Sequence, residues 1–339
     1  MYNSVQEYTL SILPAKRKQT QGGWLSFNAV CCPDNGENKD TRGRGGVIVN
    51  TNGAISYACF NCNFKTSYAP GRQLSFKYRK LLKWLGADAN EVQRLVIEAL
   101  RVKDLIQPEH IQEPAEEVEY DPHPLPEEAR SFNELLTFHE LNNWQNVPPA
   151  FHDAVNYIYS RKINMQKYDF YLTSEVEHKL SHRIIIPFIY KQNIIGYTAR
   201  AINDNIKPKY YSDYPPNVVF NLDQQTYDRK FVIVCEGPFD AMSIDGISVQ
   251  TNDISDAQAD LIQALDREII VVPDWDKPGK QLIDKAIEFG WHVSFPVWRE
   301  TCKDISEAVI KYGKLFVLKA ILSARESNSL KIKLMANKI

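Results

Sequence analysis

The sequence lacks the features that would place the chain in a membrane or outside the cell. It contains no run of eighteen apolar residues, so we expect no transmembrane helix. The N-terminus is polar and has no apolar signal-peptide core. Six cysteines among 339 residues do not suggest a disulfide scaffold. These absences together favour a reducing, cytoplasmic setting for the chain.

A strong net charge is also absent, because the formal total is −2. The charge is unevenly distributed, however: residues 1–105 carry a net +7, residues 106–130 a net −7 and residues 131–339 a net −2. Residues 106–130 also hold five of the 18 prolines, so we expect an extended linker that repels itself. The sequence thus predicts a basic N-terminal module joined to a balanced body with room for a sizeable core.

The N-terminal module has two pairs of cysteines that flank a hairpin pattern. Cys31 and Cys32 precede the pattern, and Cys59 and Cys62 end it. Within it, an Asn-Gly step separates two apolar runs, which is a strong hairpin signal. Two cysteine knuckles around a hairpin are typical of a zinc ribbon, in which the metal supplies much of the folding free energy.

The ligand set of this zinc site has alternatives. Cys59 and Cys62 form a regular C-x-x-C pair. Adjacent side chains such as those of Cys31 and Cys32 point apart on an extended chain. The C-x-x-C spacing from Cys31 falls on Asp34, whose carboxylate is also a zinc ligand in proteins. We therefore predict Cys59, Cys62 and one or both of Cys31 and Cys32 as ligands, with Asp34 as a further candidate. The alternative is that the adjacent cysteines are small core residues.

Cationic and aromatic residues alternate on or beside the hairpin. The candidate DNA-binding cations are Arg42, Arg44 and Lys65, and the interleaved aromatic residues are Tyr57, Phe60 and Phe64. This composition suits single-stranded nucleic acid, through phosphate contacts and base stacking. The alternative is a solvated face with its aromatic rings packed inward. The sequence supports the two interpretations equally.

Helical spacing follows in the next part of the chain, and then a pair of strands. Apolar residues recur at three- and four-residue intervals in 76–85, 91–100, 132–144 and 149–162, which predicts four helices. Strands are predicted at 182–190 and 194–202, joined by a short turn. These strands carry Arg183 and Arg200, and Lys209 follows them. For Arg200 we favour a phosphate-binding role over an ion pair, and for Arg183 and Lys209 the two alternatives stay equal.

Carboxylates follow two apolar strands in the C-terminal part. Phe231–Cys235 ends in Glu236, and residues 268–273 end in Asp274 and Asp276. Adjacent parallel strands would bring these three acids into one cleft, where a divalent cation such as Mg²⁺ offsets their repulsion. The alternative is that each acid caps a helix, which for Asp276 alone is equally plausible.

The remaining pattern predicts a parallel α/β sheet. A helix is expected at 280–289, a strand at 291–298, and a helix from an N-cap at Asp304 to about Ser323. Strands and helices alternate from 231 to 310, which is typical of parallel sheets. The fold class is therefore α/β, with an N-terminal zinc ribbon, a linker, a basic mixed sheet and a parallel α/β domain.

The two acidic motifs resemble a known signature. E-G-x-x-D-A at 236–241 followed by D-x-D-x-x-G at 274–279 resembles the TOPRIM signature of topoisomerases, primases and some nucleases. The order of zinc ribbon, linker, basic sheet and TOPRIM resembles a DNA primase, above all the separate primase subunits of T-even-like tailed phages. The strand that begins at Arg183 is similar to R-x-x-x-P-I of that family, and Gly196–Arg200 is similar to G-x-x-x-R.

The resemblance implies roles for residues of this chain. It implies template and NTP contacts for Arg183, Arg200, Lys209 and Asn221, with Asp304 at a third acidic position of the family. It implies Mg²⁺ or Mn²⁺ ligation by Glu236, Asp274 and Asp276, with Asp240 as a supporting acid. The sequence departs from the pattern of that family at two places. These are the Cys-Cys-x-Asp first knuckle and Trp275 between the two aspartates.

These expectations define domains, a function and its rivals. The predicted domains are a zinc ribbon (1–70), a helical segment with linker (71–130), a basic part of the core (131–229), a TOPRIM domain (230–312) and a C-terminal helix and tail (313–339). The resemblance implies synthesis of short RNA primers on single-stranded DNA from NTPs. The alternatives are a recombination mediator that only binds single-stranded DNA, and a TOPRIM nuclease.

The implied partners follow from the same resemblance. No G-x-x-x-x-G-K-[ST] P-loop is present, so a replicative hexameric helicase is expected as a separate protein. A single-strand-binding protein is the other implied protein partner. As a phage protein, the chain would act in the cytoplasm of the host bacterium.

Overall fold

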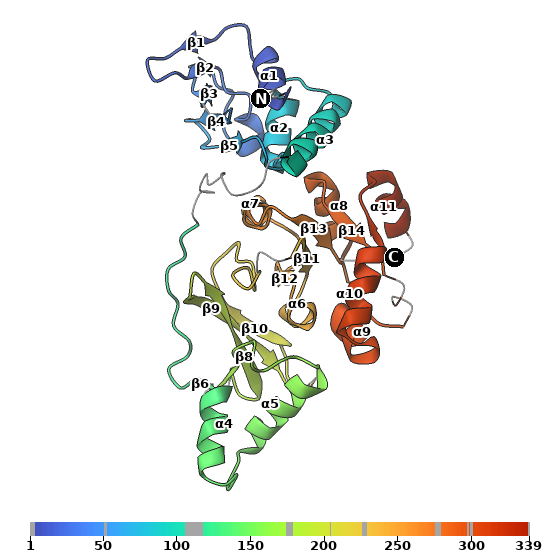
Figure 1. Ribbon diagram of the computed structural model, residues 1–339. Coiled ribbons are helices and arrows are strands. Elements are labelled where there is room, and N and C mark those ends of the chain that lie inside the picture. Colours follow the sequence, from blue (N-terminus) through green and yellow to red (C-terminus); the bar gives the residue numbers. More distant parts are fainter. Residues whose placement is uncertain are drawn as a thin grey trace. The chain divides into compact units, whose positions relative to one another are not determined.

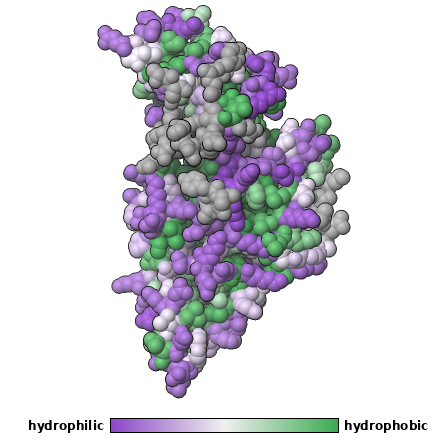
Figure 2. All heavy atoms as spheres, viewed as in Figure 1, coloured by the Kyte–Doolittle hydropathy of each residue, from purple (hydrophilic) through white to green (hydrophobic). Residues whose placement is uncertain are grey.

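The chain divides into two units of mixed α/β structure, Met1–Glu116 and Glu117–Ile339. The structure is a computed structural model (Figure 1) that describes residues 4–50, 53–105, 118–173, 179–203, 205–225, 229–274, 279–296, 298 and 301–337. None of the helices in these ranges is both long and apolar enough to cross a lipid bilayer. Hydrophilic residues cover most of the face drawn in Figure 2, and the hydrophobic residues there form separate groups.

The first unit is built on an antiparallel sheet in the order β1-β2-β3-β4-β5. Its elements are α1 (Ser4–Ser11), β1 (Lys18–Gln19), β2 (Leu25–Phe27), η1 (Pro33–Asn35), β3 (Gly45–Val49), β4 (Ile55–Cys59), β5 (Lys65–Tyr68), α2 (Phe76–Trp84) and α3 (Ala89–Leu105). The predicted hairpin is confirmed as β3 and β4, with Val47 opposite Tyr57. Asn52 of its predicted turn lies outside the described residues.

Helices α2 and α3 share one hydrophobic core with this sheet. Tyr57 from β4, Tyr78 and Leu81 from α2 and Leu95 from α3 are all buried in the same cluster. Helix α2 begins where the Ser75 hydroxyl accepts a hydrogen bond from the Tyr78 N–H (3.1 Å). The amphipathic spacing that predicted these helices therefore reflects packing onto the strands of the first unit.

The second unit begins with an antiparallel sheet in the order β10-β9-β8-β7-β6. Its elements are β6 (Arg130–Ser131), α4 (Phe132–Leu141), α5 (Pro149–Ser160), β7 (Tyr171–Leu172), β8 (Arg183–Tyr190), β9 (Asn193–Ala201) and β10 (Tyr210–Asp213). The two predicted strands are confirmed as β8 and β9, and every pairing in this sheet is antiparallel rather than mixed. Helices α4 and α5 end two to three residues earlier than predicted.

A second sheet in this unit has the order β12-β11-β13-β14-β15. The elements are β11 (Phe231–Cys235), α6 (Pro238–Ile244), β12 (Ile247–Ser248), α7 (Asp256–Ala264), β13 (Glu268–Val271), α8 (Gly279–Phe289), β14 (His292–Ser294), α9 (Ile305–Tyr312), α10 (Lys314–Ser323), β15 (Arg325–Glu326) and α11 (Ser329–Ala336). The first four strands are parallel, as predicted, and β15 is antiparallel to β14.

The prediction of one helix from Asp304 to Ser323 is wrong, because the helix is interrupted at Gly313. Gly313 has φ 84° and ψ 152°, a conformation that favours glycine, and it separates α9 from α10. Ile305 and Val309 of α9 and Val317 and Ile321 of α10 then pack in one core with β11 and β13. Two short helices follow the sheet more closely than one straight helix could.

Helix α6 lies between the two sheets of the second unit. All seven of its side chains are buried. Phe239, Ala241 and Met242 pack in the core of the antiparallel sheet, whereas Ile244 packs in the core of the parallel sheet. Helix α6 therefore packs against both sheets of the unit.

Candidate functional site

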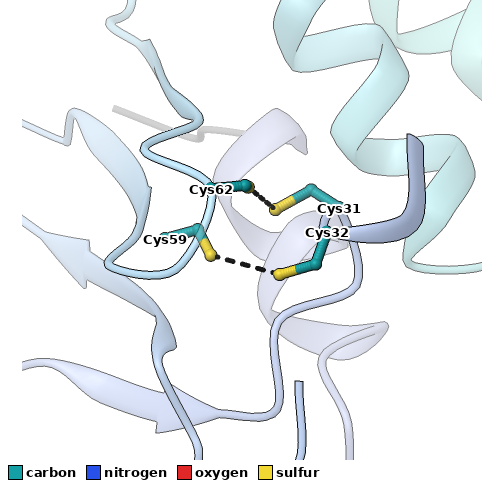
Figure 3. A group of neighbouring side chains, drawn as sticks. All are labelled: Cys31, Cys32, Cys59 and Cys62. Atoms are coloured by element: carbon teal, nitrogen blue, oxygen red, sulfur yellow. Dashed lines mark hydrogen bonds between the residues drawn. The ribbon is translucent and has the colours of Figure 1, made fainter. Parts of the chain in front are cut away.

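Four cysteines of the first unit come together in one cluster (Figure 3). Their Sγ atoms all lie within 4.8 Å of one another. The Sγ atoms of Cys31 and Cys62 are 3.4 Å apart, and those of Cys32 and Cys59 are 3.5 Å apart. Four sulfurs bound tetrahedrally to Zn²⁺ at about 2.3 Å lie about 3.8 Å from one another. The cluster therefore fits a structural zinc site.

Both adjacent cysteines belong to this cluster, and Asp34 does not. Cys32 has φ −60° and ψ −45°, so the chain turns here into η1 instead of running extended. That turn brings the Cys31 and Cys32 side chains to the same side, whereas an extended chain would point them apart. Asp34 lies in η1 with an exposed side chain, outside the group of cysteines.

Hydrogen-bond donors surround the cysteine sulfurs. The backbone N–H of Asn61 donates to Cys59 Sγ (3.4 Å), and its side-chain amide donates to Cys32 Sγ (3.3 Å). The Tyr57 hydroxyl lies 3.2 Å from Cys31 Sγ. Burial raises the pKa of the Cys32 thiol to about 11, so the donors and a bound cation are what would favour its thiolate. Asn61 was missed at the sequence level, where only its place between two cysteines could have suggested the role.

The predicted DNA-binding cations of this unit differ in their surroundings. Arg42 and Lys65 are exposed, whereas Arg44 donates through Nε to Asp40 Oδ1 (3.0 Å). Asp40 also accepts the backbone N–H groups of Ala29, Arg42 and Arg44. Burial alone would raise the pKa of Asp40, but these donors outweigh it and hold the pKa below its usual range. Asp40 therefore fixes the loop that carries both arginines.

The aromatic residues beside these cations separate into two kinds. Tyr57 and Phe64 are buried and pack against each other, with ring centroids 6.1 Å apart. Phe60 is 74% exposed between the two cysteines of the second knuckle. Of the three rings, Phe60 alone is presented for stacking on a ligand.

The acidic site lies at the carboxyl ends of β11 and β13. These parallel strands pair with Val234 opposite Val271, so Glu236 and Asp274 leave the sheet side by side. The Asp274 N–H donates to Glu236 Oε1 (3.4 Å). The chain turns towards β12 on one side of β11 and returns to β13 on the other, which makes this edge a topological switch point.

Gly279 makes the approach of these residues possible. A Cβ atom there would collide with the carbonyl oxygen of Asp274 and would lie 3.4 Å from Glu236 Oε1. Any other residue at this position would push the start of α8 away from the acids. Asp276, the third predicted magnesium ligand, lies outside the described residues, as does Trp275.

Two further acids lie close to this pair. Asp240 of α6 is 8% exposed, and its Oδ1 accepts the backbone N–H of Ser306 (2.9 Å). Asp304 caps α9 as predicted, accepting the backbone N–H of Glu307 (2.8 Å). The pKa of Asp240 is raised well above its usual range, first by burial and then by the negative charges of Asp304 and Asp274.

The acids therefore repel one another in a partly buried setting. Cys235 reports the same convergence, since burial and then the charges of Asp240, Asp274 and Glu236 raise the pKa of its thiol. Among the described residues, only the cysteines have ligand atoms close enough together to count as a formed metal cluster. Carboxylate oxygens are nevertheless the donors that Mg²⁺ prefers, and a bound cation would offset the repulsion, so the acids fit that ion.

Arg200 lies beside Phe239, the residue that precedes Asp240 in α6. It is 5% exposed on β9, with its guanidinium 4.8 Å from the ring centroid of Tyr210 and 5.8 Å from that of Phe239. Its Nε is buried and has no hydrogen-bond partner among the described residues. Burial raises the pKa of the Tyr210 hydroxyl to about 12, so this ring stays neutral beside the cation.

Arg183 has a structural role in this arrangement. It is 3% exposed, and its guanidinium donates to the carbonyl oxygens of Pro208 (2.6 Å), Lys209 (3.3 Å) and Ala199 (3.4 Å). These contacts hold the segment that leads into β10. Arg183 thus fixes the backbone at Lys209, whose own side chain is exposed.

Asn221 lies at the other end of α6 from the acids. Its side-chain amide donates to the carbonyl of Gly246 (2.7 Å), which follows α6, whereas Glu236 precedes the helix. The Gln225 side chain donates in turn to the Asn221 carbonyl (3.2 Å). The observed contacts of Asn221 therefore brace a turn and do not reach the acidic site.

Arg161 joins the site and was missed by the sequence analysis. It caps the C-terminal end of α5, and its guanidinium donates to the Ser306 hydroxyl (3.2 Å) beside Asp240. Its charge lowers the pKa of Asp240, against the larger effects that raise it. No sequence pattern links positions 161 and 306, so only the fold could reveal this contact.

The chain resembles known proteins in its structure and not in its sequence. No protein family and no curated protein sequence matches it. A DnaG catalytic core and a DnaG primase catalytic domain bound to single-stranded DNA each match 61% of this chain and 83% of their own, with 16% and 15% identity and TM-scores of 0.46. The Aquifex aeolicus primase, in its zinc-binding and RNA polymerase domains, matches 95% of this chain and 83% of its own, with 16% identity and a TM-score of 0.44. The solved structures that resemble the chain are thus DnaG-type primase catalytic cores, at low sequence identity.

Proposed function

We propose that this chain is a DNA primase, which synthesises short RNA primers from NTPs on a single-stranded DNA template. The observation that carries the proposal is the convergence of Glu236, Asp274 and Asp240 at the switch point between β11 and β13. The buried Arg200 lies beside Phe239, which precedes Asp240. Nucleotidyl transfer requires carboxylates that bind divalent metal ions. It also requires nearby basic side chains that bind the phosphates. The TOPRIM motif at 236–241 and 274–279 supports the same function.

Each acid has its own part in this mechanism. Glu236, Asp274 and Asp276 would hold one or two Mg²⁺ or Mn²⁺ ions. A bound ion neutralises triphosphate charge and lowers the pKa of the attacking ribose hydroxyl. Asp240 keeps the N-terminus of α9 in place through Ser306, and Asp304 caps that helix. The two helix-bound acids would thereby keep the acidic site electronegative and the start of α9 in place.

The cations would act on the phosphates of the nucleotide and the template. Arg200 and Arg161 lie beside Phe239, which precedes Asp240, and Arg161 also contacts Ser306. Both present planar guanidinium groups, which match phosphate oxygens in pairs. Lys209 is exposed at the start of β10 and suits the template backbone. Arg183 would position Lys209 for this contact, because its guanidinium donates a hydrogen bond to the Lys209 carbonyl.

The first unit would hold the template. Its cysteine cluster would bind zinc, and its exposed Arg42, Lys65 and Phe60 suit phosphate contacts and base stacking. The resemblance to phage primase subunits extends the proposal to a separate replicative hexameric helicase and a single-strand-binding protein as partners. The site of action would be the host cytoplasm.

A primer-synthesis assay tests the proposal. Purified full-length chain is mixed with single-stranded DNA of mixed sequence, labelled NTPs and Mg²⁺, with and without a replicative helicase. We expect short RNA products that Asp274→Asn reduces more than about a hundredfold, since weakening even a residue behind a metal ligand costs about 10–100-fold. Asp284→Asn removes an exposed acid of α8 and is the matched control.

Other outcomes would assign a different function. DNA binding by the wild-type chain without RNA products, even with the helicase, would favour the recombination mediator. Degradation of the DNA that requires Mg²⁺ and Asp274 would favour the nuclease. Undiminished synthesis by Asp274→Asn would contradict the metal-binding role of this carboxylate.

A further inference from the structure

Two aromatic rings support both guanidinium groups of the site. The Arg161 guanidinium lies 5.2 Å from the ring centroid of Tyr157 and 5.8 Å from that of Phe239. The Arg200 guanidinium lies 5.9 Å and 5.8 Å from the same two centroids. The rings themselves meet edge to face, with centroids 5.7 Å apart and planes at 87°. We call Tyr157 and Phe239 the aromatic platform.

This arrangement brings two positive charges together where few groups neutralise them. Among the described residues, neither arginine forms an ion pair with a carboxylate, although the charge of Arg161 acts on Asp240. Arg200 Nε is buried and unpartnered within that same part of the chain. Like charges in a partly buried site repel, so their common position needs a compensating attraction. The faces of the two rings supply one, because aromatic faces attract cations.

We propose that Tyr157 and Phe239 are positioning residues, whose rings hold Arg161 and Arg200 together as a binding site for the polyphosphate of the incoming nucleotide. The inference rests on the proposed function, which brings a triphosphate to the neighbouring acids. Two guanidinium groups with N–H donors suit an anion with several oxygens better than a neutral sugar or base. Phe239 directly precedes Asp240 in α6, so the same helix places the platform and one acid.

The ring of Tyr157, and not its hydroxyl, carries this role. The hydroxyl is buried and has no partner among the described residues, so it makes no contact that fixes either arginine. Phenylalanine attracts a cation through the same kind of ring face, whereas leucine has no such face. Tyr157→Phe should therefore behave as the wild type, and Tyr157→Leu should not.

Binding of inorganic triphosphate and of ATP to the full-length chain tests this inference by calorimetry, without the need for catalysis. We expect Tyr157→Leu to weaken both about tenfold, as the loss of two partly desolvated cation–π contacts implies. In primer synthesis the KM for NTPs should rise by a similar factor, with a smaller change in kcat. Tyr159→Leu is the matched control, since Tyr159 is on the same helix but 77% exposed.

The results separate this inference from the proposed function. Wild-type affinity for triphosphate in Tyr157→Leu would overturn the platform, and so would an equal loss in Tyr157→Phe. If triphosphate binding follows the ring but no RNA is made, the platform stands and the primase proposal fails. If Tyr157→Leu loses its cooperative thermal unfolding, Phe239→Leu decides in its place, with the same expected loss of triphosphate binding.

Discussion

The two candidate metal centres of this molecule are built in opposite ways. The cysteine cluster draws its ligands from the segment before η1, from the end of β4 and from the turn that follows it, all within residues 31–62. The acidic site draws its residues from the segments after β11 and β13, from α6 and from the N-cap of α9, over residues 236–304. The cysteine sulfurs are already within ligand distance of one another, whereas the carboxylates are near each other and repel.

On the proposed function, this is the difference expected between a metal that completes a fold and a metal that serves a reaction. Structural zinc sites use all four positions for protein ligands, while catalytic sites leave positions for substrate. A small unit gains most of its stability from such a closed site. The acidic site stands on the buried sheet and helices of a larger unit, so its fold should not depend on the ion.

Metal removal should show the largest difference between the two centres. A chelator strong enough to take zinc should unfold the first unit, since structural zinc contributes about 10–16 kcal/mol, as much as a whole domain's stability. Hydrogen exchange of the full-length chain should then show rapid exchange in β3 and β4 and unchanged protection in β11 and β13. Cys59→Ser should have the same effect without a chelator. Loss of protection in β11 and β13 would contradict the distinction between the two centres.

Two buried acids, one in each unit, should respond oppositely to loss of charge. Asp240→Asn keeps an acceptor for the Ser306 N–H but removes a charge that burial, Asp304 and Asp274 disfavour. In metal-free protein it should raise the free energy of unfolding of the second unit by about 1 kcal/mol. Asp40→Asn should lower that of the first unit by about 1–3 kcal/mol, because three N–H groups and Arg44 satisfy the Asp40 carboxylate.

Chemical denaturation of both variants, at neutral pH in the presence of a magnesium chelator that spares zinc, checks this pair. Primer synthesis should fall in Asp240→Asn even as the stability rises. A loss of stability in Asp240→Asn would show that its charge is compensated in the folded chain.

The smallest effect concerns Asp245, at the far end of α6 from the acids. Its carboxylate contacts Lys167 (2.9 Å), Lys314 and Arg229 (3.1 Å), and the Tyr168 hydroxyl donates to it (2.9 Å). Burial alone would raise the pKa of Asp245, but these partners lower it to about 2. Because this pKa lies below the unfolded value of about 3.9, the stabilisation is present above pH 4 and is lost as the pH falls towards 2.

Asp245→Asn should therefore cost about 1–2 kcal/mol of unfolding free energy at pH 7, with a discount for exposed partners. The difference from the wild type should shrink between pH 4 and pH 2 and also in high salt, since these cations are partly exposed. Urea unfolding at several pH values measures it, with Asp284→Asn as the control. A difference independent of pH would mean that Asp245 acts through its shape and not its charge.

Local patterns in the sequence predicted the hairpin, the C-x-x-C pair, the strands that end in Glu236 and Asp274, and the cap at Asp304. Each of these depends on neighbours within a few residues, where backbone and side-chain preferences act directly. The same reasoning predicted one helix from Asp304 to Ser323, whereas the structure has two helices separated at Gly313. Helical periodicity alone does not reveal this interruption, because the periodic apolar residues continue on both sides of it. It also left the ligand choice between Cys31, Cys32 and Asp34 open, since the turn at Cys32 follows from the folded loop.

The sequence by itself thus determined which chemistry is available: four thiols in a ribbon, acids at the ends of buried strands, and arginines on a neighbouring sheet. Only the tertiary structure decided which residues meet. It placed Arg161 beside Ser306, put Arg161 and Arg200 on one pair of rings, and turned Arg183 and Asn221 to bracing backbone carbonyls. The physical reason is that the contacts with Ser306, Phe239, Pro208 and Gly246 join positions 25 to 145 residues apart. They also depend on how α6 packs between two sheets, and no local preference of the chain specifies them.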